Sequence, residues 1–350
     1  MTPYALMADV HLHRWTAFSS VEEDGVNSRL RILHREIRRA ANEVRAAGGN
    51  RLIVAGDLFH VRGNIAPSVL NPTVDVFKEI VDWGIEVVII PGNHDLEGKN
   101  SERIGSAVTS LEGVGCRVVN QPEIIGDVFL VPWFESIDDL KSLLDSFASV
   151  RSDTVLSSLD LILHAPIDGV ITGLPDHGLT PEYLSSLGFR RVFAGHYHHS
   201  KYFGDGVYSI GALAHHSWSD VNTKAGFLIV GEEVRYMASH APSFIDLDER
   251  VKEDEIPLLV DGHYVRVKVP VEGMEAVEAI RAELHEYGAR GVIVQAVKAP
   301  VMQRQSSVTE SMAAGVSIQE GVTEFVRSQL FEHEEEVAKA ALQILSEVGA

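Results

Sequence analysis

The 350-residue sequence has a single cysteine, no long apolar run and far fewer bases than acids. One cysteine, Cys116, excludes an internal disulfide and is typical of a protein kept in a reducing cytoplasm. No apolar stretch approaches the roughly 18 residues that a membrane-spanning helix needs. The first residues, MTPYALMADVHLH, lack the basic region of a signal peptide. We therefore expect an intracellular, cytoplasmic protein that does not associate with a membrane.

The formal net charge is −20, from 50 acidic and 30 basic residues. Lysine and arginine supply much of the affinity of nucleic-acid-binding proteins, so on its own this balance argues against a nucleic-acid-binding protein. The bases are unevenly spread, because residues 27–51 carry seven arginines against two glutamates. This cluster fits a solvated helix face, which is the simpler interpretation, or a surface that follows DNA.

Apolar strand-like segments alternate with segments of helical periodicity over the first 245 residues. This alternation predicts an α/β (α+β) fold with helices covering the sheets, and we place its main domain at residues 1–245. A charge-dense linker is expected at 246–255, followed by a small α/β cap domain at 256–303. Residues 304–350 are predicted to form a C-terminal helical segment, whose apolar stripe either packs on the cap or docks onto a partner.

Successive strands of the main domain end in residues that commonly bind metal ions. These residues are Asp9, His11, Asp57, Asn93, His94, Asp95, His164, His196 and His198. Since α/β sheets place their sites where strands run out into loops, these side chains should converge. A lone D-x-H or G-D is common, whereas G-N-H-D followed by G-H-x-H at strand ends is a specific pattern.

Oxygen ligands mixed with imidazoles favour manganese, iron or zinc over magnesium. Seven of these nine residues, all but His94 and Asp95, are the candidate ligands, and seven suffice for two ions if one carboxylate bridges them. Two divalent ions roughly 3.5–4 Å apart can hold a phosphoryl oxygen and activate water for in-line attack. The sequence therefore predicts a two-ion centre, most consistent with Mn²⁺, that acts on a phosphoester.

The ordered motifs D-x-H, G-D, G-N-H-D, H and G-H-x-H span residues 9–198 and resemble those of the calcineurin-like metallophosphoesterase superfamily. The resemblance implies a two-sheet sandwich flanked by helices. It also implies two ligand sets: Asp9, His11, Asp57 and His198 for one ion, and Asp57, Asn93, His164 and His196 for the other. By the same resemblance, His94 acts on the leaving oxygen and Asp95 orients the ring of His94.

The segment GDLFHVRG, residues 56–63, narrows the resemblance. Phosphoprotein phosphatases of this superfamily read G-D-x-x-D-R-G, and their arginine holds a monoester phosphate. Here His60 replaces that aspartate and Arg62 is displaced by one position, which is similar to the SbcD type of recombination nuclease. The resemblance implies that His60 helps to orient the DNA backbone. It also implies manganese-dependent 3′-to-5′ exonuclease activity on duplexes and endonuclease activity on single strands and hairpins.

The SbcD-type resemblance also implies a partner, an SbcC-like coiled-coil ATPase that the C-terminal segment binds. The compact length is similar to that of phage-encoded members. In the family, helices corresponding to residues 72–83 and 101–113 pair in a homodimer, although here they would equally serve to cover the sheet.

This chain departs from the family pattern where His199 and Ser200 follow G-H-x-H, and where Gly211 is followed by alanine. His13 and Arg14 are candidates for contacts with DNA, although loop packing explains them more simply. Arg62 fits a phosphate contact or a helix cap. His215 and His216 are given no role.

Two other functions stay open. A partner-independent phosphodiesterase acting on nucleotides or other small diesters is favoured by the net charge. A subunit that keeps the fold and only regulates an ATPase is disfavoured by the presence of all seven candidate ligands.

Overall fold

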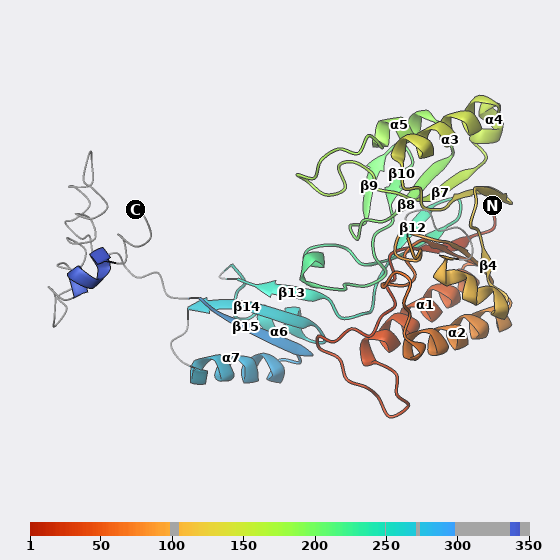
Figure 1. Ribbon diagram of the computed structural model, residues 1–350. Coiled ribbons are helices and arrows are strands. Elements are labelled where there is room, and N and C mark those ends of the chain that lie inside the picture. Colours follow the sequence, from red (N-terminus) through yellow and green to blue (C-terminus); the bar gives the residue numbers. More distant parts are fainter. Residues whose placement is uncertain (99–104, 249, 271–273, 298–336, 344–350) are drawn as a thin grey trace. The chain divides into compact units, whose positions relative to one another are not determined.

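The computed structural model describes residues 1–98, 105–248, 250–270, 274–297 and 337–343. Met1–Ala296 forms one compact unit and Val297–Ala350 a second (Figure 1). Of the predicted C-terminal helical segment, residues 337–343 are helical. The remainder of that segment, and residues 298–303 of the predicted cap, lie outside the described residues.

Two six-stranded sheets make up most of the first unit. The first has the order β12-β11-β1-β2-β3-β4, comprising β12 (Val234–Ala238), β11 (Gly226–Val230), β1 (Tyr4–Met7), β2 (Arg51–Ala55), β3 (Glu86–Ile90) and β4 (Arg117–Val118). The second has the order β5-β6-β7-β8-β10-β9, comprising β5 (Glu123–Ile125), β6 (Val128–Val131), β7 (Asp160–His164), β8 (Arg191–Gly195), β10 (Val207–Ser209) and β9 (Lys201–Gly204).

The middle strands of both sheets are parallel, so their carboxyl ends share one edge. In the first sheet β1 to β4 run parallel, β11 is antiparallel to β1, and β12 is antiparallel to β11. In the second sheet β6, β7, β8 and β10 run parallel. Strand β9 pairs antiparallel with β10.

The two sheets face each other across a shared apolar layer. Leu6, Ile53 and Val88 of the first sheet join one buried cluster with Leu130, Ile162 and Phe193 of the second. A strand that is buried on both faces consists almost entirely of apolar residues, and the sequences of these strands show this pattern. The predicted sandwich of two sheets with flanking helices is confirmed.

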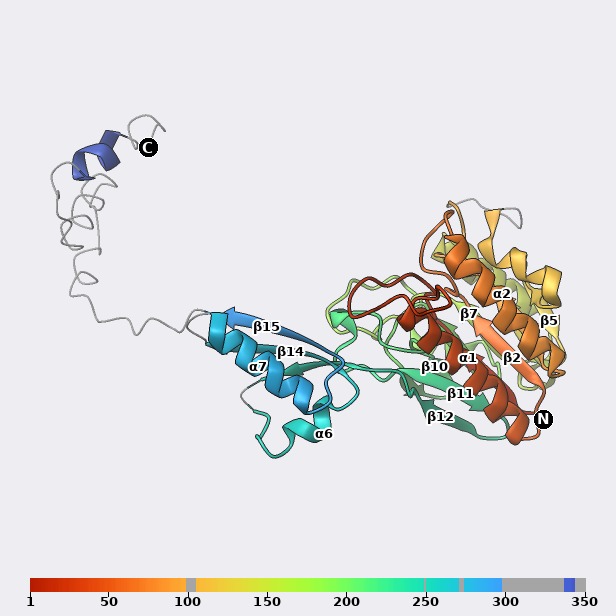
Figure 2. The same cartoon turned by 90° about the horizontal axis from the view of Figure 1, so that it is seen from below.

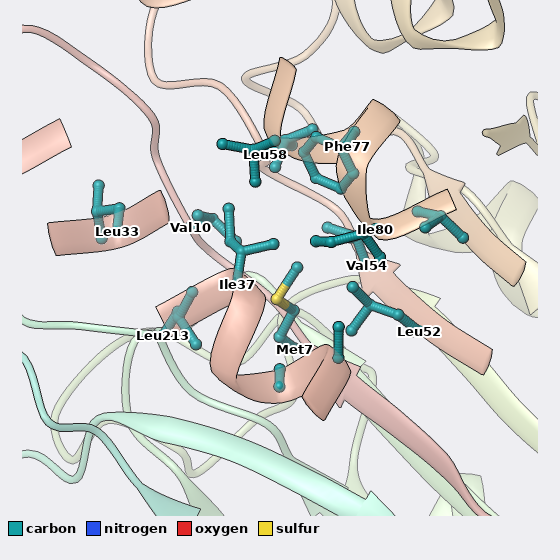
Figure 3. Close-up of a cluster of buried hydrophobic side chains, with 14 of the residues drawn as sticks. Met7, Val10, Leu33, Ile37, Leu52, Val54, Leu58, Phe77, Ile80 and Leu213 are labelled. Atoms are coloured by element: carbon teal, nitrogen blue, oxygen red, sulfur yellow. The ribbon is translucent and has the colours of Figure 1, made fainter. Parts of the chain in front are cut away.

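Helices α1 (Ser28–Ala46) and α2 (Pro67–Asp82) cover the outer face of the first sheet (Figure 2). The side chain of Asn27 caps α1 by accepting hydrogen bonds from the backbone N–H groups of Arg29 and Leu30, the second and third residues of the helix. Helix α2 starts at Pro67, five residues before the predicted start, and contains Pro72. Figure 3 shows Met7, Ile37 and Phe77 pointing toward one another between sheet and helices.

The outer face of the second sheet packs on a separate cluster that includes Phe129, Leu144 and Leu184. The helices on this side are α3 (Ile137–Ser149), α4 (Asp153–Leu156) and α5 (Pro181–Ser186). The helix predicted near 101–111 is a 3₁₀ helix, η2 (Ala107–Val114), and residues 101–104 lie outside the described residues. A second 3₁₀ turn is η3 (Trp218–Asp220).

A third, three-stranded sheet follows, with the order β13-β14-β15. It consists of β13 (Phe244–Leu247), β14 (Tyr264–Pro270) and β15 (Gly291–Val297), with helices α6 (Ile256–Val260) and α7 (Met274–Glu286). Asp246 and Leu247 were expected in a linker, but they pair with β14 because Leu247 contributes to the small core of this sheet. Among the described helices, none has the length and apolarity needed to cross a bilayer.

Candidate metal centre

The seven predicted ligands lie at carboxyl ends of neighbouring strands of both sheets. Asp9 and His11 follow β1, Asp57 follows β2, and Asn93 follows β3, while His164 ends β7 and His196 and His198 follow β8. Asp9, His11, Asp57 and His196 have positive φ angles of 49°, 48°, 51° and 113°. Non-glycine residues rarely adopt this conformation, and such strain is concentrated at functional sites.

The ligand atoms form two neighbouring groups. Those of Asp9, His11 and His198 all lie within 4.8 Å of one another, and so do those of Asp57, His164 and His196. Asp57 is adjacent to both groups, since its Oδ2 lies 3.8 Å from His11 Nε2 and 3.4 Å from His164 Nε2. The structure thus brings the predicted ligands together, with Asp57 adjacent to both groups.

Asn93 belongs to the second group. Its Oδ1 lies 3.2 Å from both His164 Nε2 and His196 Nδ1. An amide oxygen converging with two imidazole nitrogens and a carboxylate is a donor set suited to a borderline divalent ion.

Two glycines allow this convergence. A Cβ on Gly56 would lie 2.1 Å from His164 Nδ1, and a Cβ on Gly92 would lie 2.2 Å from Asp57 Oδ1. Gly56 also has a φ of +88°, which other residues rarely adopt. The glycines of G-D and G-N-H-D are therefore required by the close approach of ligand side chains.

The protonation states of the ligands follow from burial and from one another. Burial lowers the pKa of His196 to about 3 and lowers that of His11 as well, so both imidazoles are neutral, as ligation requires. Burial alone would lower the pKa of His164, but the Asp57 carboxylate raises it to about 9. Burial raises the pKa of Asp9 to about 6. Such buried carboxylates and imidazoles fit a site that holds cations.

A second layer of contacts orients two of the imidazoles. His164 Nδ1 lies 2.8 Å from the Ala55 carbonyl oxygen, and His198 Nδ1 lies 2.8 Å from Asp220 Oδ1. An Nδ1–H that donates to such an acceptor leaves Nε2 unprotonated and available to an ion. Asp220 was not singled out from the sequence. The one local signal was the spacing of Ser217 and Asp220, which form a capping box on η3.

His94 and His60 lie beside the ligand groups, and both are half-buried. The backbone N–H of His94 donates to Asp57 Oδ1 over 2.8 Å, and His94 Nδ1 lies 2.7 Å from the carbonyl oxygen of His60. The two rings stack with centroids 5.6 Å apart, and His60 Nδ1 lies 3.4 Å from His11 Nδ1. The structure therefore places both predicted imidazoles beside the ligands.

The predicted contact of Asp95 with the His94 ring is wrong. The Asp95 carboxylate instead accepts hydrogen bonds from three backbone N–H groups, those of Gly92, Leu58 and Phe59, over 2.8–3.2 Å. Asp95 thereby ties the two ligand loops that follow β2 and β3 to each other. The carbonyl of His60 takes the orienting role that the sequence assigned to Asp95.

The three residues predicted to contact the substrate, His13, Arg14 and Arg62, differ in their surroundings. The ring of His13 packs 5.1 Å from that of His60 and 5.5 Å from that of Trp15. Arg14 and Arg62 are exposed. Only His13 is thus tied by ring contacts to the imidazoles of the centre.

His215 and His216 carry contacts that the sequence did not indicate. His216 is buried, and its Nε2 lies 2.9 Å from the carbonyl oxygen of Asp9, which fixes the backbone of the first ligand. His215 Nδ1 accepts the backbone N–H of Phe244 over 3.1 Å, which ties β13 to this region. The carbonyl of His216 in turn accepts from the buried Arg29 guanidinium over 2.8 Å.

The comparison with known families agrees with this geometry. The family model for calcineurin-like phosphoesterases matches residues 2–200, which is more than half of the sequence. The chain belongs to the calcineurin-like phosphoesterase family. The enzyme class predicted from the sequence is confirmed at the level of a phosphoesterase, and the described residues include groups able to hold a metal ion.

Among curated proteins, the chain is similar to exonuclease subunit 1 of Enterobacteria phage T4, with 25% identity over 175 residues. The match covers 46% of this chain and 47% of that protein, so the chain spans about half the length of the curated relative. Similar solved structures include a dimetal phosphatase from Danio rerio, at 14% identity and a TM-score of 0.36, covering 68% of this chain and 96% of that one. Another is the nuclease MPE of Pseudomonas putida, at 17% identity and a TM-score of 0.31, covering 67% and 87%.

Proposed function

We propose that this phosphoesterase is a manganese-dependent DNA nuclease that hydrolyses phosphodiester bonds with two divalent ions. Its activities would be a 3′-to-5′ exonuclease on duplexes and an endonuclease on single strands and hairpins. The observation that carries the proposal is the stacked pair of imidazoles, His94 and His60, beside the two ligand groups. The similarity to a phage exonuclease subunit supports the same substrate.

The proposed chemistry divides between ions and side chains. Two divalent ions, when bound, hold a phosphoryl oxygen and activate water for in-line attack. His94, whose Nδ1–H donates to the His60 carbonyl, presents Nε2 to the departing oxygen; with a second proton on Nε2 the ring acts as an acid or a charge stabiliser. A departing alkoxide needs a proton, and a diester carries one charge where a monoester carries two. A second imidazole, His60, therefore suits a diester better than a phosphate-gripping arginine.

We further propose that the chain works as the nuclease subunit of an SbcCD-like complex with a coiled-coil ATPase, inside the cell, in DNA repair, recombination or replication. The printed name of the phage relative, an exonuclease subunit, supports a complex. A partner-independent phosphodiesterase acting on small diesters is the second candidate, and the net charge of −20 favours it.

The test is hydrolysis of end-labelled duplex and hairpin DNA with Mn²⁺, Mg²⁺, Fe²⁺ or Zn²⁺, by the full chain with and without an ATPase partner. His94→Ser is expected to stop hydrolysis, and His60→Ser to reduce duplex cutting at least tenfold while Mn²⁺ still binds. His177→Ser, which changes an exposed loop histidine, is the matched control. If wild type hydrolyses only a small chromogenic diester under every condition, the DNA assignment is wrong and the second candidate replaces it.

A further inference from the structure

Three imidazoles beside the two ligand groups form a third group of possible metal ligands. One nitrogen each of His11, His60 and His94 lies within 4.8 Å of the other two. The ring of His11 has its centroid 5.2 Å from that of His60 and 4.9 Å from that of His94. The rings of His60 and His94 are half-buried, so an ion can reach this group from solvent.

The spacing of the nitrogens suits a tetrahedral ion. Zn–N bonds of roughly 2.0–2.1 Å at tetrahedral angles place two imidazole nitrogens about 3.4 Å apart. His11 Nδ1 and His60 Nδ1 lie 3.4 Å apart, and the nitrogen of His94 lies within 4.8 Å of the ligand atoms of both. Three imidazoles with a fourth position open to solvent are the arrangement of a three-histidine zinc site.

The donors of the third group favour a different ion from those of the two ligand groups. Asp9 belongs to one ligand group and Asp57 to the other, whereas the third group consists of imidazoles. Carboxylate oxygens suit manganese and magnesium, and imidazoles suit zinc, copper and nickel. The affinity of a nitrogen site also rises from Mn²⁺ to Zn²⁺, so the preference for Zn²⁺ over Mn²⁺ is largest at the third group.

His11 cannot serve the third group and the first ion at the same time. Its Nε2 lies 3.8 Å from Asp57 Oδ2, and its Nδ1 lies 3.4 Å from His60 Nδ1. A neutral imidazole offers the lone pair of one nitrogen, because its other nitrogen carries the proton. An ion bound through Nδ1 therefore takes His11 away from the ion that Asp9 and His198 would hold.

An ion in the third group also engages the two imidazoles that we propose to act on the substrate. His94 Nδ1 donates its proton to the carbonyl of His60, so Nε2 carries the lone pair that an ion binds. An Nε2 bound to an ion cannot carry a proton to a departing oxygen. His60 is withdrawn from the substrate by the same ion.

We propose that His11, His60 and His94 form an inhibitory zinc site, which is filled as an alternative to the first ion of the catalytic pair. Zn²⁺ and Mn²⁺ then exclude each other through His11, although they occupy different positions. The site itself depends on the geometry of the imidazoles alone. The loss of hydrolysis rests in addition on the proposed role of His94.

The test loads the full chain with Mn²⁺, adds Zn²⁺ in steps and counts the released Mn²⁺ by electron paramagnetic resonance. Hydrolysis of bis(p-nitrophenyl) phosphate is followed in the same samples. One equivalent of Zn²⁺ is expected to release one of the two Mn²⁺ ions and to lower hydrolysis by a factor on the order of 100. X-ray absorption at the zinc edge should detect three imidazoles on zinc, whereas each of the two ligand groups contributes two.

His60→Ser separates the two positions, because it removes one imidazole from the third group and leaves both ligand groups complete. Loss of a contact behind a ligand already costs roughly 10–100-fold in metal affinity, so loss of this ligand should weaken zinc binding at least about 100-fold. Both Mn²⁺ ions should then stay bound, which also shows that the variant is folded. His177→Ser, at an exposed loop position, is the matched control and should release Mn²⁺ as wild type does.

Equal release of Mn²⁺ from wild type and from His60→Ser would overturn the inference, because zinc would then replace manganese within the ligand groups. A zinc ion with two imidazoles and carboxylate oxygens would lead to the same conclusion, and so would retention of both Mn²⁺ ions by wild type in excess Zn²⁺. Each of these results leaves the DNA nuclease proposal standing, since that proposal is tested on DNA and does not depend on where zinc binds.

Discussion

Replacing Asp220 by asparagine tests whether the contacts behind the ligands control metal affinity. Asp220 is buried, and its two oxygens serve three donors: Oδ1 accepts from His198 Nδ1, and Oδ2 accepts from the backbone N–H groups of His216 and Ser217 over 2.7 and 2.9 Å. Burial raises the pKa of this carboxyl, but the hydrogen bond and charge of His198, together with the backbone N–H groups of Ser217 and His216, outweigh burial and lower the pKa well below the usual range. The group is therefore an anion at any working pH.

An asparagine at position 220 has one acceptor oxygen for these three donors. Its NH₂ group must face either the two backbone N–H groups or His198 Nδ1. Facing His198 Nδ1 is favoured, because the NH₂ group then meets one donor and not two. In that orientation the NH₂ group donates and Nδ1 of His198 becomes the acceptor. The imidazole then carries its proton on Nε2, where it can no longer bind an ion. Loss of such a carboxylate behind a ligating histidine typically costs 10–100-fold in metal affinity, and we expect Asp220→Asn to fall in that range.

The assay is the Mn²⁺ concentration that gives half-maximal hydrolysis of a chromogenic diester, together with calorimetric titration of Mn²⁺ into the protein. Asp220→Asn should raise the half-saturating concentration 10–100-fold while kcat at saturating Mn²⁺ changes only a few-fold. Asp205→Asn, at an exposed loop position with positive φ that asparagine tolerates, is the matched control. An unchanged half-saturating concentration in a variant with lowered Tm would refute the reasoning, since Asp220 would then only cap η3.

The remaining predictions concern stability and metal binding. Asp160 accepts hydrogen bonds from Arg191 Nη2, Arg190 Nε and Tyr4 Oη, each over 2.8 Å. Asp160→Asn should lower the free energy of unfolding in urea by about 3–5 kcal/mol, because the buried Arg191 loses its ion-pair partner. Burial raises the pKa of Asp160, but the two arginines together outweigh burial and lower the pKa. The stability that Asp160 contributes is therefore complete above about pH 4 and is lost as the pH falls further. In urea titrations, wild type should lose its stability advantage over Asp160→Asn below pH 4, and an equal difference at pH 3 and pH 6 would contradict this. Gly56→Ala should abolish Mn²⁺ binding, because its Cβ would meet the His164 ring, whereas Gly84→Ala, at a φ of +81° with open space, should cost only about 1 kcal/mol of stability and keep Mn²⁺ binding in calorimetry.

The ligand set could be predicted from the sequence because each ligand sits where an apolar strand stops. Parallel strands bring such positions to one edge whatever their separation in the chain, so Asp57 and His164 meet although 107 positions separate their numbers in the sequence. The glycines before Asp57 and Asn93 were equally visible in the sequence. The local reason for them, a close approach by His164 and by Asp57, required the structure.

The supporting residues could not be predicted, because their roles depend on which loops meet. Asp220 and His216 lie in the connection between β10 and β11, which contains η3, and only the fold brings this connection to His198 and to the Asp9 carbonyl. Asp95 was misassigned for a related reason. It adjoins His94 in sequence, but its carboxylate points at backbone donors of a different loop.

Net charge is a weak guide to the substrate of this site. Exposed charges more than about 8–10 Å apart are largely screened at physiological salt, so the 50 acids spread over the chain contribute little at the centre. Close to the ligands, the buried Asp9 and Asp57 carboxylates are the groups that matter, and the divalent ions they fit reverse the local sign of the field. A phosphodiester would then be attracted to the centre irrespective of the overall acidity, so the net charge does not decide between DNA and a small diester as the substrate.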